Sequence, residues 1–382
     1  MALPKVVIDS AIWVTPSLSA LPIELVSIQG TQIVPAHLKD ENALLTRTVT
    51  RVDSNLLQDS PIAFVGTASA GTDHIDTRYL SERGIKLANA AGCNAGAVAD
   101  YVLDAIYQCQ RLESLISGAT VGLVGYGAVG RHLAARLSKL GGKVKVYDPY
   151  VESTDVESTE AGVTLCALPE VLGCSIVSLH AALHTDQPHP SAQMIDNTAV
   201  SYISPDALFI NAGRGGLVTE EALHRMADKG VMLVLDTWPE EPSVSQELLS
   251  RATFATPHIA GYTRTAKSNA TDFLIEPLVR ALSLDYPFNT LESEDTRRVM
   301  VDLSRQSDSH GLMDVMKVIS RLAQDDDQFR KSWETSQTPD NFETQRTQYR
   351  LRDQYGALTL QAANASTELQ RLLSAAGFRL GS

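Results

Sequence analysis

The sequence predicts an α/β fold built on parallel sheets, and three observations support this. Short apolar segments alternate with helical stretches through most of the 382 residues, which is the pattern of parallel α/β domains. Segment 119–150 places a glycine-rich turn between a strand and a helix. Beyond about residue 285 the chain becomes more polar and charged, which indicates a small additional domain.

The first unit is expected to contain strands followed by a long helix. Strand candidates lie in 5–9, 41–53 and 61–67, each ending at polar or glycine residues. Segment 84–112 ends the unit with a helix that Asn94 is placed to cap. The apolar positions of that helix recur every three or four residues: Val98, Val102, Ala105, Ile106 and Cys109.

The second unit begins at 119–150 and continues the alternation. Its further strand candidates are 174–180, 207–213, 231–238 and 254–261. In the polar C-terminal part, the TPDN sequence at 338–341 predicts a break between two helical stretches. A short strand near 356–363 and a closing helix over 366–378 follow.

Composition and charge exclude several classes of protein. The chain is 44% hydrophobic, enough for a substantial core, and its formal net charge is −13. An acidic surface repels nucleic acid and anionic lipid, so neither is expected as a partner. No apolar run approaches the roughly 20 residues that cross a bilayer, and the N-terminus lacks the long apolar stretch of a secretory signal. We therefore expect a cytoplasmic protein.

The four cysteines predict neither a metal site nor disulfides. Cys93, Cys109, Cys166 and Cys174 form no CxxC pair and have no zinc-site spacing. Four cysteines in a chain of this length are no disulfide framework. Reduced thiols are expected, and no metal.

The GYGAVG sequence at 125–130 is a candidate dinucleotide site because a buried strand precedes it and a helix follows. Gly125 permits the tight turn, Gly127 lets a pyrophosphate approach the backbone, and Gly130 allows close helix–strand packing. Val129 in the same motif is assigned to the cofactor as well. Asp148 ends the next strand 18 residues after Gly130, where an acid accepts both ribose hydroxyls and repels a 2′-phosphate. The site favours NAD over NADP; the alternative is a plain glycine turn and a solvated aspartate.

Arg214, Glu241 and His258 are the candidate catalytic residues, each at or after the end of a predicted strand. Oxidation of a 2-hydroxy acid needs a cation for the carboxylate, a base for the hydroxyl proton and a carboxylate that orients the base. Arginine, histidine and glutamate suit these tasks in that order. Taken singly, each also has a plain explanation: a paired arginine, a solvated loop acid, a buried histidine.

The motifs SAGTDHID (69–76), GYGAVG, NAGRG, LDTW…EEP and TPHIAG occur in an order that resembles the D-isomer-specific 2-hydroxyacid dehydrogenases, over most of residues 40–265. The resemblance implies Arg214, Glu241 and His258 as the catalytic set, with His258 accepting or donating the proton. It assigns Asp236 to the nicotinamide end of the cofactor. It also implies a flavodoxin-like split substrate domain beside a Rossmann NAD domain.

A narrower resemblance points to family members that oxidise a phosphorylated four-carbon hydroxy acid in vitamin B6 biosynthesis. It is carried by RTVT (47–50), FVGTASAGTDHID (64–76), AAGCNA (90–95) and TPHIAGYT (256–263). By position it implies substrate contacts from Thr48, Ser69 and Tyr262 and a cofactor contact from Gly261. Arg47 is expected to join the phosphate site, and the Ala70–Gly71 backbone to hold the carboxylate; for Thr48 and Ser69 ordinary turn chemistry is the alternative.

The same resemblance extends into the tail, through DDQFRK (326–331), FETQRTQYRLR (342–352) and ASTELQRLLSAAGF (365–378). It implies a small α+β dimerisation domain over 286–382 and hence a homodimer. The substrate domain is then 1–92, completed by about 259–285, and the NAD domain 93–258. Arg346, Arg350 and Arg352 form a basic cluster there: either one of them reaches the substrate phosphate across the dimer, or the cluster is a solvated helix face.

One departure and two rival functions accompany this interpretation. The threonine and proline that usually follow the histidine of the strand at 174–180 are replaced by Ala181 and Ala182, and this replacement bears on NAD affinity. His184 and His189 in the next loop are interpreted as surface residues. The nearer rival is another family member, of the phosphoglycerate or glyoxylate/hydroxypyruvate type. The other is a non-catalytic NAD-sensing scaffold, for which a base beside the nicotinamide has no use.

Overall fold

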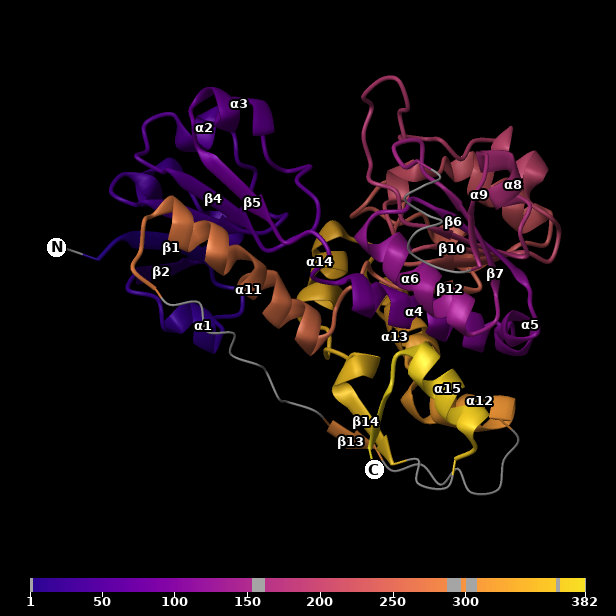
Figure 1. The fold of residues 1–382 in the computed structure, drawn as a ribbon. Coiled ribbons are helices and arrows are strands. Elements are labelled where there is room, and N and C mark those ends of the chain that lie inside the picture. The colour runs from indigo at the N-terminus through magenta and orange to yellow at the C-terminus, as the bar shows by residue number, and fades with distance from the viewer. Residues whose placement is uncertain (1–2, 153–161, 287–296, 300–307, 362–364, 382) are drawn as a thin grey trace. The chain divides into compact units, whose positions relative to one another are not determined.

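The computed structural model describes residues 3–152, 162–286, 297–299, 308–361 and 365–381, and within them the chain forms two compact units (Figure 1). One unit combines the described residues of 1–94 and 263–295, and the other those of 95–262 and 296–382. Every strand pair in both units is parallel. The parallel α/β architecture expected from the sequence is confirmed.

The first unit is a five-stranded sheet in the order β2-β1-β3-β4-β5. Its strands are β1 Lys5–Asp9, β2 Glu24–Ile28, β3 Ala43–Thr46, β4 Phe64–Thr67 and β5 Lys86–Asn89. The connections contain α1 Pro16–Ser19, η1 Gly30–Gln32, η2 Pro35–Leu38, α2 Ser54–Leu57 and α3 Thr77–Glu82. The chain returns to this unit with the long helix α11, Arg264–Ala281, which packs across β4 and β5 (Figure 1).

The sequence predicts three of these strands, and the structure adds β2 and β5. Both are edge strands, and neither contains a fully buried side chain. An edge strand with half-exposed side chains has no continuous apolar run, so its sequence signal is weak.

The second unit contains a seven-stranded sheet in the order β12-β11-β10-β9-β6-β7-β8. Its strands are β6 Thr120–Val124, β7 Lys143–Tyr147, β8 Val163–Leu165, β9 Ile176–Leu179, β10 Leu208–Asn211, β11 Met232–Leu235 and β12 Phe254–Ala255. The chain winds from β6 toward β8 and then in the other direction from β9 to β12. Ligands of doubly wound sheets bind where the winding direction changes, here beyond the carboxyl ends of β6 and β9.

Helices cover this sheet and bury α4 on all sides. The helices are α4 Ala95–Gln108, α5 Leu112–Ile116, α6 Ala128–Lys139, α8 Leu168–Leu172, η3 Ala199–Tyr202, η4 Gly215–Leu217, α9 Glu220–Asp228 and α10 Gln246–Arg251. Every residue of α4 from Ala95 to Ile106 is buried, although the sequence indicates one apolar stripe. The reason is that α6 packs on one part of α4, while two helices of the C-terminal segment, α12 (Asp308–Ile319) and α13 (Leu322–Thr335), pack on others.

The C-terminal segment shares its core with the seven-stranded sheet. Its elements are β13 Arg297–Val299, α12 Asp308–Ile319, α13 Leu322–Thr335, α14 Pro339–Thr347, η5 Tyr355–Ala357, β14 Leu358–Gln361, α15 Thr367–Ala376 and β15 Arg379–Gly381. Leu312 and Leu372 belong to the same buried cluster as Val102 of α4 and Leu133 of α6. The break predicted at TPDN lies between α13 and α14, and Thr338 caps α14. Residues 362 and 363 of the predicted strand lie outside the described residues.

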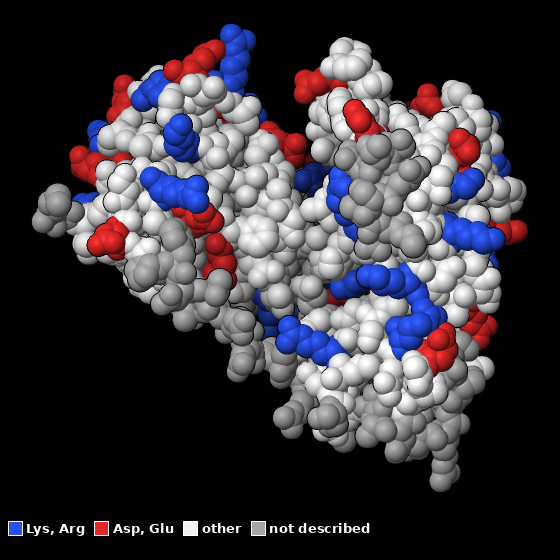
Figure 2. All heavy atoms as spheres, viewed as in Figure 1, with Lys and Arg blue, Asp and Glu red and all other residues white. Residues whose placement is uncertain are grey.

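The surface carries charges of both signs. On the face shown in Figure 2, acidic and basic side chains are interspersed over both units. In the described part of the chain, no helix combines the length and the apolar character needed to span a bilayer.

Candidate active site

The turn between β6 and α6 requires glycine at two positions. Gly125 has φ +98°, and a Cβ there would lie 2.5 Å from the backbone nitrogen of Ala181. A Cβ on Gly130 would lie 2.1 Å from the carbonyl oxygen of Gly125. The first glycine therefore permits the turn, and the second lets α6 start directly against it.

Gly127 differs, because no described atom lies within 4 Å of the place where its Cβ would be. It is the N-cap of α6, and as a glycine it has no side chain to cap the first N–H groups of that helix. The first N–H groups of a helix, here those of Ala128 and Val129, have no partner within the helix, and the helix dipole is positive at this end. The open space at Gly127 therefore suits an anionic pyrophosphate.

Asp148 follows β7 and binds the same turn. One carboxylate oxygen accepts the Tyr126 N–H at 2.9 Å, and the other accepts the Tyr150 N–H at 3.0 Å. A carboxylate has about four lone-pair sites, so acceptor capacity is left for two ribose hydroxyls. A negative charge at this position opposes a 2′-phosphate, as predicted from the sequence.

A cavity of about 370 Å³ adjoins Asp148. Tyr150, His184 and His189 line it, and the Tyr150 ring centroid is 6.1 Å from that of His184 and 5.7 Å from that of His189. The interpretation of both histidines as plain surface residues is therefore incomplete, since they form a wall of this cavity. Planar rings beside Asp148, the acid predicted to bind the ribose, suit an adenine, and the residues present fit NAD.

His180 follows β9 at the edge of this site and is partly buried. Its Nε2 lies 2.9 Å from Ser178 Oγ. Burial lowers the pKa of His180 to about 4, so the imidazole is neutral at physiological pH. The next two residues, Ala181 and Ala182, offer no side-chain donor to a cofactor.

Arg214, Glu241 and His258 follow β10, β11 and β12, which are neighbours in the sheet. Carboxyl ends of parallel strands meet at one edge, so the three loops lie together. A Cβ on Gly215 would lie 1.7 Å from the carbonyl oxygen of Trp238, so the loop after β10 packs directly on the loop after β11. Arg214 Nη1 donates to the Gly213 carbonyl at 2.9 Å.

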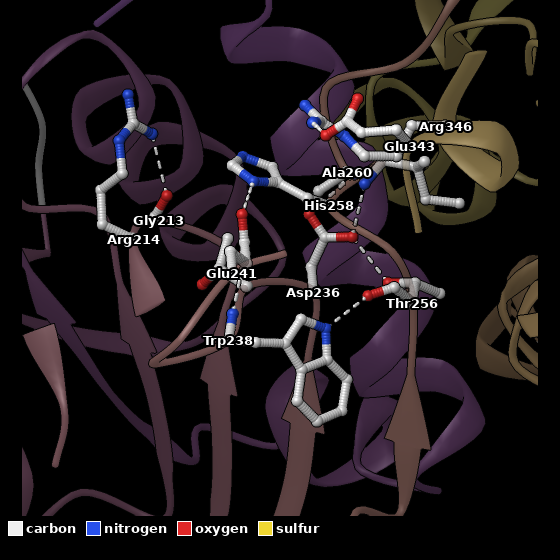
Figure 3. A network of polar contacts seen from close by, with 12 residues as sticks. Gly213, Arg214, Asp236, Trp238, Glu241, Thr256, His258, Ala260, Glu343 and Arg346 are labelled. Carbon is white, nitrogen blue, oxygen red and sulfur yellow. Dashed lines mark hydrogen bonds and ion pairs between the residues drawn. The ribbon is translucent and has the colours of Figure 1, made fainter. Parts of the chain in front are cut away.

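Glu241 and His258 form a hydrogen-bonded pair (Figure 3). His258 Nδ1 lies 2.8 Å from Glu241 Oε2, and Glu241 Oε1 accepts the Trp238 N–H at 2.8 Å. Burial alone would raise the pKa of Glu241, but His258, the Trp238 N–H and the charge of Arg346 together lower it. The carboxylate is thus ionised, so Nδ1 carries the proton and Nε2 is the nitrogen left to accept another.

Asp236 organises the backbone around His258. Its carboxylate accepts the Thr256 hydroxyl at 2.6 Å and the N–H groups of Ile259 and Ala260 at 2.7 and 2.9 Å. His258 itself has φ +55°, in the left-handed region. The Asp236 side chain is fully buried, and burial raises its pKa against these hydrogen bonds. Its contact with the nicotinamide stays a prediction.

Two arginines of the C-terminal segment contact the loop that follows β12 and carries His258. Arg352, partly buried, donates to the carbonyl oxygens of Ile259 and Ala260. The Arg346 guanidinium carbon lies 5.8 Å from the Tyr262 ring centroid, and Arg346 Nη1 pairs with Glu343 at 2.7 Å. The solvated-face interpretation therefore holds for neither arginine, while Arg350 is exposed. Gly261 and Tyr262 follow Ala260 in the same loop, and both are partly buried.

The predicted substrate contacts of the first unit lie at the ends of β3 and β4. Arg47 Nε donates to Asp9 at 2.8 Å, and Thr48 is exposed. Ser69 Oγ lies 2.7 Å from Thr67 Oγ1 and donates to the Gly71 carbonyl at 2.9 Å, while Asn89 donates to the Ala70 carbonyl at 2.7 Å. Side-chain hydrogen bonds thus shape the loop from 67 to 71. Its role in substrate binding stays a prediction.

The described residues include all four cysteines. They contain no group of three or more His, Cys, Asp or Glu arranged for a metal ion. All four cysteines are free thiols. Burial raises the pKa of Cys93 to about 11 and that of Cys109 to about 12, so these two thiols are protonated at neutral pH.

Comparison with known proteins gives one consistent result. The family model "D-isomer specific 2-hydroxyacid dehydrogenase, NAD binding domain" matches residues 93–260. The chain is 32% identical over 366 residues to an erythronate-4-phosphate dehydrogenase from Hahella chejuensis, with 94% of each chain covered. It is 35% identical over 367 residues to the enzyme of the same name from Marinobacter nauticus, again with 94% of each covered.

Solved structures share the fold. D-lactate dehydrogenase from Aquifex aeolicus, complexed with NAD and lactic acid, is 22% identical with a TM-score of 0.59, and the match covers 73% of this chain and 95% of that one. NAD⁺-bound 3-phosphoglycerate dehydrogenase from Entamoeba histolytica is 20% identical with a TM-score of 0.62, over 76% of this chain and 100% of that one.

Proposed function

This chain belongs to the erythronate-4-phosphate dehydrogenases among the D-isomer-specific 2-hydroxyacid dehydrogenases, and on that premise we propose that it oxidises 4-phospho-D-erythronate to (R)-3-hydroxy-2-oxo-4-phosphooxybutanoate. It is an NAD-dependent dehydrogenase. The observation that carries the substrate chemistry is the His258–Glu241 pair, whose loops adjoin the loop of Arg214. Membership of this family supports the identity of the acid.

His258 acts as the base in this proposal. With Nδ1–H donated to Glu241, Nε2 takes the proton from the C2 hydroxyl, and the ionised Glu241 stabilises the imidazolium that forms. Arg214 holds the substrate carboxylate and polarises the C2 oxygen. When bound, NAD accepts the hydride from C2. Asp236 holds the His258 loop in place through the Ile259 and Ala260 N–H groups.

The first unit supplies further substrate contacts. We assign the carboxylate to the N–H groups of the Ala70–Gly71 loop as well as to Arg214. Arg47, Thr48 and Ser69 are assigned to the phosphate, for which guanidinium and hydroxyl groups are suitable donors. Arg47 is paired with Asp9 at 2.8 Å, so phosphate would compete with that carboxylate. Tyr262 contacts the substrate and Gly261 the cofactor.

The cellular setting follows from the same family membership. We infer a cytoplasmic homodimer that serves vitamin B6 biosynthesis. The C-terminal segment, which shares the core of the NAD-binding sheet, is assigned to the dimer interface. Sedimentation analysis of the purified chain tests the dimer directly, and a monomer would contradict it.

Comparison of substrates tests the reaction. Phosphoerythronate, 3-phosphoglycerate and reduction of glyoxylate are assayed with the same enzyme preparation, and kcat/KM is expected to be highest for phosphoerythronate. Faster oxidation of phosphoglycerate would place the enzyme with the nearer rival group.

His258→Ala separates catalysis from cofactor sensing. Loss of a general base lowers kcat by roughly 10²- to 10⁴-fold, while NAD binding is preserved. A scaffold that only senses NAD would show no turnover in the wild type and no effect of this substitution.

A further inference from the structure

Arg346 is a cation at the edge of the catalytic loops that the reaction described so far does not use. It lies in the last turn of α14, far along the chain from the strands that carry Arg214 and His258. Its guanidinium carbon is 5.8 Å from the ring centroid of Tyr262 and 5.9 Å from that of Phe342. Its charge also acts on Glu241. The arginine thus belongs to the surroundings of the His258–Glu241 pair.

The guanidinium keeps unused hydrogen-bonding capacity. Nη1 pairs with Glu343 at 2.7 Å, whereas the buried Nε–H has no hydrogen-bond partner among the described residues. The Arg346 side chain is only 14% exposed, while Glu343 is 40% exposed. A buried donor without a partner is costly. Glu343 is exposed enough to turn toward solvent, and an anionic ligand could then take its place at Nη1.

The position of Arg346 matches the shape of the substrate. Figure 3 shows Arg214 on one side of His258 and Arg346 on the other, with Glu241 beneath the imidazole. A hydroxy acid with its carboxylate at Arg214 and C2 at His258 extends C3 and C4 away from Arg214. The group on C4 is therefore directed to the side of His258 on which Arg346 lies.

We propose that Arg346, supplied by the C-terminal segment of the same chain, binds the terminal phosphate of the substrate in addition to the donors already assigned to that phosphate, and sets the preference for phosphorylated hydroxy acids. This rests on the proposed function, because it assumes a carboxylate at Arg214 and a proton acceptor at His258. Arginine suits the task because its planar fork pairs with two phosphate oxygens, which a lysine ammonium cannot do in the same geometry. The Tyr262 ring supports the cation from one face.

The test compares two substrates that differ only in the phosphate, 4-phosphoerythronate and erythronate. In Arg346→Gln, kcat/KM for the phosphorylated acid is expected to fall about 10- to 100-fold, which is the range for a lost charge-assisted hydrogen bond. For erythronate it should change less than about threefold. Arg346→Lys should lie between the two enzymes. An equal fall for both acids, or no fall for either, would overturn the proposal.

A matched control removes another Arg–Glu pair with the same spacing. Arg371 pairs with Glu368 three residues earlier on α15, as Arg346 pairs with Glu343 on α14. Arg371→Gln should therefore leave the ratio of the two kcat/KM values unchanged. NAD affinity by fluorescence titration and thermal unfolding are measured for each variant, so that a folding defect in Arg346→Gln is recognised.

Binding of inorganic phosphate tests the phosphate site without turnover, so its result does not depend on the proposed reaction. Calorimetry of the wild type with NADH bound should show a phosphate site whose Kd rises at least tenfold in Arg346→Gln and is unchanged in Arg371→Gln. If the wild type fails to oxidise phosphoerythronate but this difference holds, the assigned reaction is wrong and the phosphate site stands. An unchanged phosphate Kd in Arg346→Gln would refute the site itself.

Discussion

Asp236 and Arg352 bind the backbone of the same two residues, Asp236 through their N–H groups and Arg352 through their carbonyl oxygens. The residues are Ile259 and Ala260, which follow His258. Asp236 directly follows β11, and Arg352 comes from the C-terminal segment. The left-handed backbone of His258, φ +55°, is held between them. We infer that Arg352 is a positioning residue for the base.

Arg352→Lys is expected to lower kcat about tenfold while the KM for NAD changes less than twofold, because an ammonium cannot donate to both carbonyls with the geometry of the guanidinium. Arg352→Met should in addition destabilise the protein by about 3–5 kcal/mol, since it leaves the enclosed Asp325 and Asp100 without this cation. Steady-state kinetics and urea unfolding measure the two effects.

Arg330 provides the matched control. It also lies in the C-terminal segment, pairs with Asp326 and donates to two carbonyl oxygens, those of Leu249 and Ala252. These carbonyls belong to α10 and its C-cap residue, and not to the residues that follow His258. Arg330→Lys should therefore cost stability but leave kcat unchanged. If both lysine variants lowered kcat equally, the positioning role of Arg352 would be wrong.

Gly125 and Gly127 are expected to respond differently to alanine. Gly125→Ala places a Cβ 2.5 Å from Ala181 N at a positive φ, and strain of this kind costs roughly 1–3 kcal/mol in the free protein. Gly127→Ala meets nothing within 4 Å, so unfolding should change by less than about 1 kcal/mol. The added methyl occupies the space assigned to the pyrophosphate, so the Kd for NAD should rise more than tenfold. NAD titration of Gly127→Ala with wild-type affinity would argue against that placement.

The nucleotide half of the site was predictable because its signal is local. A strand, three glycines at fixed spacing, a helix and an acid after the next strand all lie within residues 120–148. Arg214, Glu241 and His258 were predictable for a related reason: each follows a strand, and the three strands are neighbours. The edge strands β2 and β5 escaped detection because their side chains are half-exposed and form no apolar run.

Which arginine of the C-terminal segment lies near the catalytic loops could not be decided from the sequence. Arg346 and Arg352 lie about ninety residues after His258, in a polar stretch where exposed and buried arginines look alike. Only the packing of α13 on β12 and α4, and of α14 on α13, decides that Arg352 is partly buried and Arg350 is exposed. The burial of Asp236 depends in the same way on the path of the 256–260 loop, which carries no periodic pattern.

Glu241→Gln should reduce stability by an amount that depends on pH. The native pKa of Glu241 lies below its ordinary value of 4.5, so the ionised carboxylate stabilises the folded state at pH values above 4.5. That contribution is lost as the pH falls through the lower native pKa. The difference in unfolding free energy between wild type and variant is therefore expected to be constant from pH 8 to 6 and to shrink below about pH 4.5. A difference that grew on acidification would have the wrong sign.

The lowered pKa of His180 predicts a second pH dependence of the unfolding free energy, over a higher pH range than that of Glu241. Its native pKa is about 4 against an ordinary value of 6.5, so between these values the unfolded chain binds a proton that the folded protein does not. Unfolding free energy should then rise with pH from about 4 to 6.5, by up to about 1.4 kcal/mol per pH unit from this group. Urea unfolding of wild type and His180→Asn at half-unit intervals measures the slope, which the variant should lose. Because burial and not the Ser178 hydroxyl lowers this pKa, Ser178→Ala should retain the slope; if it were lost there too, the hydrogen bond at Nε2 would be its cause.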